Sequence, residues 1–109
     1  MTEDFDDVMS IETIETGDEV TVRVVGEIDT FTAPVLGRSL THAVEHGARH
    51  LVIDLRGTTF LGSAGAGVLT TVRKLVSLRG ATMTLRPTPK IHHFLEITGL
   101  LDLFETDWK

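Results

Sequence analysis

The sequence predicts a single α/β domain with a small mixed sheet of four or five strands and helices packed on that sheet. The chain has 109 residues, a length that fits one domain. Apolar residues alternate with polar ones in some stretches, as in strands, and recur every three or four residues in others, as in helices. The two kinds of stretch follow one another along the chain, as they do where helices connect parallel strands.

Two strands are predicted to open the domain as a hairpin. Residues 10–15 alternate imperfectly between apolar and polar side chains, whereas residues 19–25 alternate cleanly and are rich in valine. Such alternation with β-branched residues is typical of a half-buried strand. Residues 16–18, Thr-Gly-Asp, favour a turn between the two strands, which are therefore antiparallel.

A helix is predicted after the second strand. Thr30 or Thr32 can cap its start, and Pro34 lies near its first turn, where the missing N–H of proline costs nothing. Gly47 ends the helix, because glycine readily adopts the left-handed conformation found at many helix ends. The apolar stripe of this helix contains Val35, Leu36, Leu40, Ala43 and Val44.

The next strand and helix flank a glycine-rich stretch. Residues 51–55 are almost continuously apolar, which predicts a central strand covered on both faces, followed by a turn at residues 56–57. Residues 68–78 have apolar side chains at three-and-four spacing, which predicts a helix packed on the sheet, and Gly80 ends it.

The last part of the chain repeats the pattern of strand and helix. Residues 81–85 predict a strand, and a helix follows with Thr88 as its cap, Pro89 at its first position and Gly99 at its end. Residues 100–104 supply a last apolar segment. Each β-α-β connection implies adjacent parallel strands, so that with the hairpin the sheet is mixed.

Composition narrows the classes of function. The chain contains no cysteine, which excludes disulfides, thiolate metal sites and cysteine nucleophiles. Its formal net charge of −6 repels nucleic acid and anionic membranes, so we expect neither as a partner. No apolar run approaches the roughly 20 residues of a membrane span, and the acidic start is not a signal peptide. We expect a cytoplasmic protein with a flexible acidic tail at residues 1–9 and the domain at residues 10–109.

Residues 58–69, Thr-Thr-Phe-Leu-Gly-Ser-Ala-Gly-Ala-Gly-Val-Leu, are the stretch around which the chain is organised. Its glycines let another molecule approach the backbone closely, and the start of the following helix favours an anion such as phosphate. Two interpretations of Ser63 follow. Either its hydroxyl only caps the helix, or it is a regulatory hydroxyl, presented to a protein partner, that carries a phosphate.

The motif and its surroundings resemble the STAS domain of bacterial anti-anti-sigma factors, also called anti-sigma factor antagonists. The resemblance lies in residues 26–29 (Gly-Glu-Ile-Asp), 51–55, 60–69 and 97–100 (Ile-Thr-Gly-Leu), and it covers roughly residues 10–105. It implies a single STAS-like domain.

In that family the first serine of a central Asp-Ser-Ser-Gly-Leu-Gly motif is phosphorylated by a partner anti-sigma factor that is also a serine kinase. The unphosphorylated domain binds this partner and frees the sigma factor, and a metal-dependent phosphatase resets the switch. The resemblance implies that Ser63 is the phosphorylation site and that the chain is a monomer or weak dimer, not an enzyme, without cofactor or metal. The implied partner-binding residues are Glu27, Asp29, Gly62, Ser63, Ala64, Gly65, Ala66 and Gly67.

The sequence departs from the family motif at three positions. Gly62 stands where the acid usually lies, Ala64 replaces the second serine, and Ala66 replaces leucine. Losing the acid removes a repulsive neighbour of a phosphate on the adjacent serine. Gly62 and Ala64 also leave open a STAS module that works without phosphorylation, as a scaffold or as a regulatory subunit of a signalling or transport assembly.

Other chemistry has weaker support in the sequence. The glycines do not follow the Gly-x-Gly-x-x-Gly order of dinucleotide-binding loops, and Leu61 stands where a hydrolase nucleophile elbow needs glycine. A serine nucleophile would also need a base, for which His92 or His93 has no supporting spacing. His42 and His46 lie four residues apart on one helix face, but the sequence suggests no third ligand for a metal.

Overall fold

The computed structural model describes the backbone of residues 2–5 and the whole of residues 8–107. Its strands are β1 (Thr2–Phe5), β2 (Met9–Thr16), β3 (Glu19–Ile28), β4 (His50–Leu61), β5 (Thr82–Arg86) and β6 (Glu105–Thr106). Its helices are α1 (Ala33–Glu45), α2 (Ser63–Leu78) and α3 (Pro89–Ile97), followed by the short 3-10 helix η1 (Leu101–Leu103).

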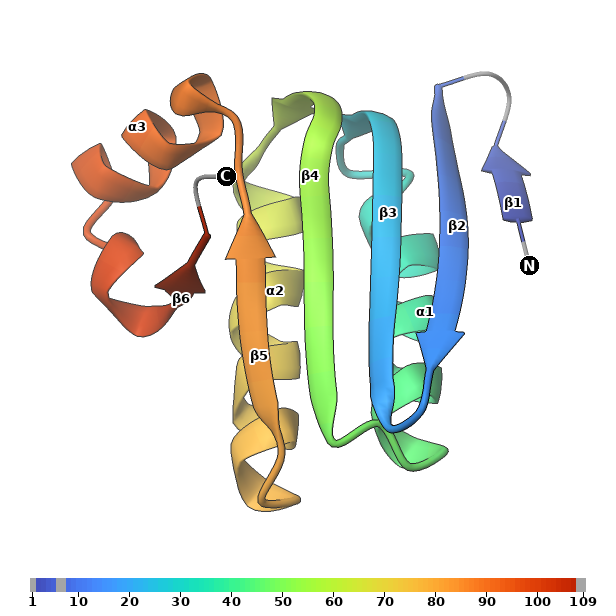
Figure 1. The fold of residues 1–109 in the computed structure, drawn as a ribbon. Coiled ribbons are helices and arrows are strands. Elements are labelled where there is room, and N and C mark those ends of the chain that lie inside the picture. Colours follow the sequence, from blue (N-terminus) through green and yellow to red (C-terminus); the bar gives the residue numbers. More distant parts are fainter. Residues whose placement is uncertain (1, 6–7, 108–109) are drawn as a thin grey trace.

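The strands form one mixed sheet in the order β1-β2-β3-β4-β5-β6 (Figure 1). The pairs β1–β2 and β2–β3 are antiparallel, and the pairs from β3 to β6 are parallel. Because the strand order advances in one direction and such crossovers are right-handed, α1 and α2 lie on the same face of the sheet. The predicted α/β class and mixed sheet are confirmed, and the short edge strands β1 and β6 extend the sheet beyond the four or five strands expected.

The core lies between the sheet and the helices α1 and α2. Alternate residues of the central strands point toward the helices, as the period of two requires. Each fully buried aliphatic side chain contributes roughly 1.5–3 kcal/mol through removal from water. The side chains with no exposed surface include Val22, Val24, Leu36, Leu40, Ile53, Leu55 and Leu69.

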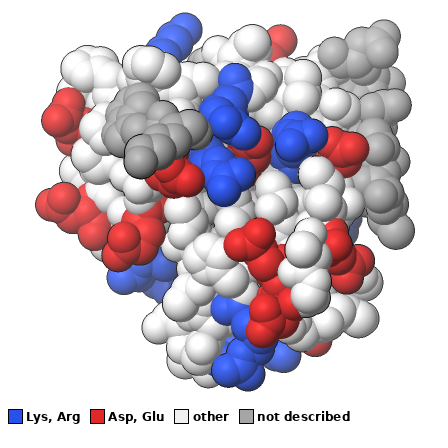
Figure 2. Space-filling view, viewed as in Figure 1, with Lys and Arg blue, Asp and Glu red and all other residues white. Residues whose placement is uncertain are grey.

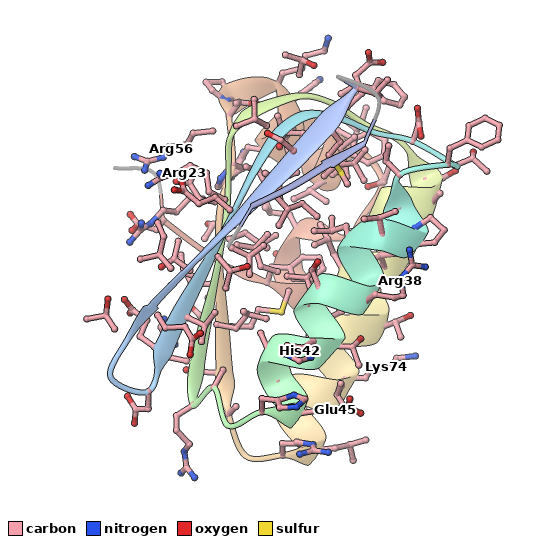
Figure 3. The ribbon with its side chains drawn as sticks, turned by 90° about the vertical axis from the view of Figure 1, so that its right-hand side faces the viewer. Arg23, Arg38, His42, Glu45, Arg56 and Lys74 are labelled. Atoms are coloured by element: carbon pink, nitrogen blue, oxygen red, sulfur yellow. The ribbon has the colours of Figure 1, made fainter. Side chains whose placement is uncertain are left out.

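Residues 51–55 are each at most 2% exposed, so the prediction that this strand is covered on both faces is confirmed. On the face of β3 and β4 that lies away from α1 and α2, charged side chains contribute to this cover (Figures 1 and 2). Asp54 is only 2% exposed, because Arg56 lies 2.9 Å and Arg23 3.5 Å from its carboxylate. Arg23 also pairs with Glu12 at 2.8 Å. The hydrogen bond from Arg56 holds the pKa of the Asp54 carboxyl below its ordinary value. Figure 3 shows both arginines on the side of the sheet away from the helices.

Strand β4 continues through residues 56–57, where the sequence predicts a turn. It pairs with β3 over its whole length. The register of this pairing shifts twice, between Arg23 and Val25 and between Gly26 and Glu27, as it does at a β-bulge. The Thr58 hydroxyl, buried at this point, donates to the carbonyl of Val24 at 2.9 Å. Pairing with a strand distant in the sequence thus overrides a local turn signal.

The acidic start of the chain adds an edge strand in place of the flexible tail predicted for residues 1–9. The backbone of β1 pairs antiparallel with β2, and Met9 at the start of β2 belongs to the core. The edge of a sheet presents unpaired N–H and C=O groups, and at β2 the backbone of β1 pairs with them. Residues 1, 6 and 7 lie outside the described residues.

Helix α2 begins earlier than predicted, at Ser63 and not at Val68. Residues 64–67 are glycine and alanine, so they carry no apolar periodicity that could reveal a helix. Tertiary packing holds them in the helix despite the poor helix propensity of glycine.

Three other predicted helix signals are confirmed. The Thr88 hydroxyl accepts a hydrogen bond from the Ile91 amide at 3.1 Å, and Gly47 and Gly80 have left-handed φ angles of 100° and 69°. None of the helices in residues 8–107 is long and apolar enough to cross a membrane.

Candidate functional site

The candidate site lies at the end of the sheet where β3 and β4 finish and α1 and α2 begin, at the top of Figure 1. Because β3 and β4 are parallel, their carboxyl ends meet at the same edge. Glu27 is in register with Phe60 and Ile28 with Leu61, and the amide of Gly62 donates to the carbonyl of Ile28 at 3.1 Å. The structure therefore brings together the two segments that the sequence singles out.

Ser63 is the first residue of α2 and is exposed. The N-cap position before it is occupied by Gly62, whose backbone is extended with φ −94° and ψ −176°. Ser63 is thus not the cap of the helix, and among the described residues no partner hydrogen-bonds its hydroxyl. This geometry leaves the hydroxyl accessible to a second protein.

The start of α2 is also an open site for negative charge. The first hydrogen bond of the helix runs from the Ala66 amide to the Gly62 carbonyl at 3.0 Å, so the amides before Ala66 have no acceptor within the helix. No side chain caps them, and the first turn contains no acidic residue. A 16-residue helix presents the positive end of its dipole at this point. A phosphate on Ser63 would find unpaired amides close by.

The predicted contact residues of α2 divide into two faces. Gly65 is buried because its backbone packs against two strand ends: an added Cβ would lie 2.5 Å from Leu61 and 2.6 Å from Ile28. Ala66 is buried as well. By contrast, Ala64 and Gly67 line an open groove of about 840 Å³ between α1 and α2. The surface available to a partner therefore comprises Ser63 and the groove residues. Gly65 and Ala66 are not part of this surface, because they pack toward the interior of the domain.

Asp29 fixes the turn that leads into α1. Its carboxylate accepts hydrogen bonds from the amides of Phe31 and Thr32, each at 2.9 Å. The hydrogen bond from the Thr32 amide is the main reason why the pKa of Asp29 lies below its ordinary value of 3.8. Thr32, the N-cap residue of α1, does not cap that helix: its buried hydroxyl accepts from the Asp29 amide at 2.8 Å and donates to the Glu27 carbonyl at 2.9 Å.

Glu27 has the opposite character from Asp29. Its side chain is exposed and has no hydrogen-bond or charge partner among the described residues. Its backbone is fixed, because its amide donates to the carbonyl of Val8 at 2.8 Å and its carbonyl accepts from Thr32. Of the two acidic residues expected to bind a partner, Glu27 thus has a free carboxylate, whereas the carboxylate of Asp29 is committed to a turn.

Two exposed aromatic side chains at this end were not among the predicted site residues. Phe31 follows Asp29 in the turn and is 77% exposed, and Phe60 is 46% exposed. The ring of Phe60 lies over Gly62, 3.1 Å from the place where a Cβ would be. Their position beside the two motifs was the available signal, but apolar residues next to a motif are more often buried, and only the structure shows their exposure.

The histidines considered from the sequence do not build a second site. The ring of His42, which Figure 3 labels on α1, stacks on the ring of His46, just after the end of this helix, with centroids 3.9 Å apart. His93 lies 3.6 Å from Glu96 on α3. Among residues 8–107, no three histidine, aspartate or glutamate side chains gather as a metal site would need.

A model of the STAS domain family matches residues 10–108 of the chain. The chain belongs to the STAS family. Among curated relatives, this STAS chain is similar to the anti-sigma-B factor antagonist of Bacillus subtilis. The two are 29% identical over 102 residues, and the matched region covers 93% of each chain. The family identification made from residues 26–29 and 60–69 is thereby confirmed.

Solved STAS structures have the same fold. An anti-sigma factor antagonist from Mycobacterium paratuberculosis matches with a TM-score of 0.82 and 27% identity over 96% of this chain and 90% of that one. The phosphorylated form of the Bacillus cell fate determinant SpoIIAA matches with a TM-score of 0.71 over 91% and 92% of the two chains. At 18% identity, the second match shows likeness of fold alone.

Proposed function

We propose that this STAS chain is a cytoplasmic anti-sigma factor antagonist that is switched off by phosphorylation at Ser63. In the unphosphorylated form it binds an anti-sigma factor that is also a serine kinase, and this binding releases the sigma factor. The chain is a regulatory binding protein and not an enzyme, because the kinase supplies the ATP. The observation that carries the proposal is the exposed, uncommitted hydroxyl of Ser63 at the first residue of α2.

Charge explains how a single modification releases the partner. A phosphate on Ser63 adds roughly −1.5 to −2 charges. In a packed interface this charge loses its water, at a cost of several kcal/mol unless the partner pairs it. A loss of about 3 kcal/mol lowers the affinity by more than a hundredfold.

The domain itself tolerates the same charge without refolding. The phosphate would lie at the open start of α2, where the dipole and the unpaired amides favour an anion and no first-turn acid repels it. The switch therefore acts on the complex and leaves the fold intact. Relatives named as antagonists of anti-sigma factors support the general role.

Phosphate transfer tests the acceptor residue. Purified anti-sigma factor kinases from the source bacterium are incubated with labelled ATP and with wild type, Ser63→Ala or Ser77→Ala. Ser77 is a matched control, since it is an exposed serine in the last turn of the same helix. We expect label in wild type and Ser77→Ala and none in Ser63→Ala. Equal label in all three would exclude Ser63 as the acceptor.

Affinity tests the switch. We expect Ser63→Ala to bind the anti-sigma factor tightly and Ser63→Glu to bind it at least about tenfold more weakly, measured by calorimetry, because even one buried unpaired charge is costly. A metal-dependent serine phosphatase is the expected enzyme for removing the phosphate and restoring tight binding. Equal affinities of the two variants would contradict the switch.

The departures at Gly62 and Ala64 favour one second candidate, a STAS module that works without phosphorylation. In that case the chain is a scaffold or a regulatory subunit of a signalling or transport assembly. A tight complex with a partner of another class, together with unmodified Ser63 in cells by mass spectrometry, would support it over the antagonist.

A further inference from the structure

Phe31 presents a large apolar side chain to solvent at the end of the sheet that also carries the proposed phosphorylation site. It is 77% exposed, in the turn between β3 and α1. Single exposed apolar residues are common on protein surfaces and need no explanation by themselves. Phe31 differs from them because of the turn that holds it and because a second exposed aromatic side chain, Phe60, lies at the same end of the sheet.

The turn is fixed by polar groups on both sides of Phe31. Its own amide donates to the Asp29 carboxylate at 2.9 Å, and the next residue, Thr32, is fully buried and bonded to the chain at Glu27 and Asp29. The amide of Ala33 donates to the Asp29 carbonyl at 2.9 Å. A rigid turn that holds its most apolar side chain outward is preorganised for contact with another surface.

A second exposed aromatic side chain lies at the start of α2. Phe60, 46% exposed, lies over Gly62, directly before Ser63. The turn of Phe31 is joined to this segment by the hydrogen bond from the Gly62 amide to the Ile28 carbonyl. Phe31, Phe60 and Ser63 thus lie at the same end of the sheet, which is the end that the proposed partner approaches.

We propose that Phe31 is an anchor residue for the anti-sigma factor, and that its ring enters an apolar pocket of that protein with Phe60 at the pocket edge. This inference rests on the proposed function, because it names the contact by which the same partner is held. Aromatic side chains seated in partner pockets carry a large share of interface energy. Because Glu27 offers a free carboxylate near the end of β3 that leads into this turn, the rim of the partner pocket is basic.

The experiment compares two exposed apolar residues. The probe is the purified anti-sigma factor kinase that binds Ser63→Ala most tightly, and its affinity is measured by calorimetry in that background. Phe31→Ser removes the anchor. Leu78→Ser is the matched control, since Leu78 is 85% exposed at the far end of α2. Thermal unfolding of each variant establishes that it is folded.

We expect Phe31→Ser to weaken binding by about thirtyfold or more, as for a central interface residue, and Leu78→Ser by less than about threefold. Phe31→Leu, which keeps an apolar side chain, is expected to retain most of the affinity. Unchanged affinity of Phe31→Ser, with tight binding of the Ser63→Ala parent, overturns the anchor and leaves the proposed function standing. Failure of every anti-sigma factor to bind the parent overturns the proposed function, and the anchor with it.

Discussion

Helices α1 and α2 start at the same end of the sheet, but only at the start of α1 do side chains of the described residues hydrogen-bond the backbone. At α1, the Asp29 carboxylate accepts hydrogen bonds from two amides, and Thr32 ties the turn to the end of β3. At α2, Gly62 offers no side chain for capping, and the hydroxyl of Ser63 is uncommitted. The start of α1, the closed start, thus carries a negative charge from the Asp29 carboxylate. The start of α2, the open start, carries no such charge among the described residues.

This difference indicates which helix start can take part in regulation. A phosphate near the start of α1 would be repelled by Asp29, which stays ionised because its pKa is lowered by the hydrogen bond from the Thr32 amide. At the start of α2 the first turn contains no acid. The closed turn instead orders Phe31 for contact, so that the two helix starts supply the two halves of one proposed interface.

Packing under the open start gives the largest expected effect. Gly65→Ala places a methyl group within 2.6 Å of Leu61 and Ile28, so we expect a loss of about 3 kcal/mol in the free energy of unfolding. Gly67→Ala is the matched control, since its Cβ would meet nothing within 4 Å. It should gain up to about 1 kcal/mol from helix propensity. Urea unfolding measures both, and equal shifts would show that the start of α2 is not tightly packed.

The closed start is tested by Thr32→Val, which keeps the shape of the side chain and removes its hydroxyl. The Asp29 amide and the Glu27 carbonyl each lose a hydrogen bond, so we expect a loss of about 1–2 kcal/mol in the free energy of unfolding. Because the turn loosens, binding of the anti-sigma factor should weaken together with stability. Reduced stability with unchanged binding would separate this turn from the interface.

The carboxylate of the closed start makes its contribution dependent on pH. The folded-state pKa of Asp29 is below the ordinary value of 3.8, so its stabilising contribution is present above that value and is lost as the pH falls through the lower, folded-state pKa. Asp29→Asn removes this titration. We expect the stability of wild type to fall more steeply below pH 3.8 than that of the variant, measured by thermal unfolding across acidic buffers. Parallel curves would contradict the role given to Asp29.

Closing the open start should have the smallest effect on stability. Gly62→Asp supplies a side chain that can cap α2, which is worth a few tenths of a kcal/mol relative to glycine. The ring of Phe60, 3.1 Å from the new Cβ, has to move aside. The added carboxylate would repel a phosphate on Ser63, so phosphorylation should lower the melting temperature of Gly62→Asp and not that of wild type. The same shift in both proteins would argue against an open anion site.

Much of the fold could be predicted from the sequence, because strands and helices that bury one face carry their period in the residues themselves. The valines of residues 19–25 and the three-and-four spacing of residues 68–78 predicted β3 and most of α2. The cap at Thr88 was predicted too, since a hydroxyl before a proline is a local signal. For the candidate site, the motif around Ser63 indicated the family and the end of the sheet to examine.

Interactions between distant segments decided the rest. The length of β4 depends on its pairing with β3, and the early start of α2 depends on the fit of Gly65 against Ile28 and Leu61. A local pattern cannot report such contacts, since they depend on which atoms meet after the chain has folded. For the same reason, the sequence alone determined that a serine follows Gly62. Only the tertiary structure decided that its hydroxyl is uncommitted and that Phe31 is exposed at the same end of the sheet.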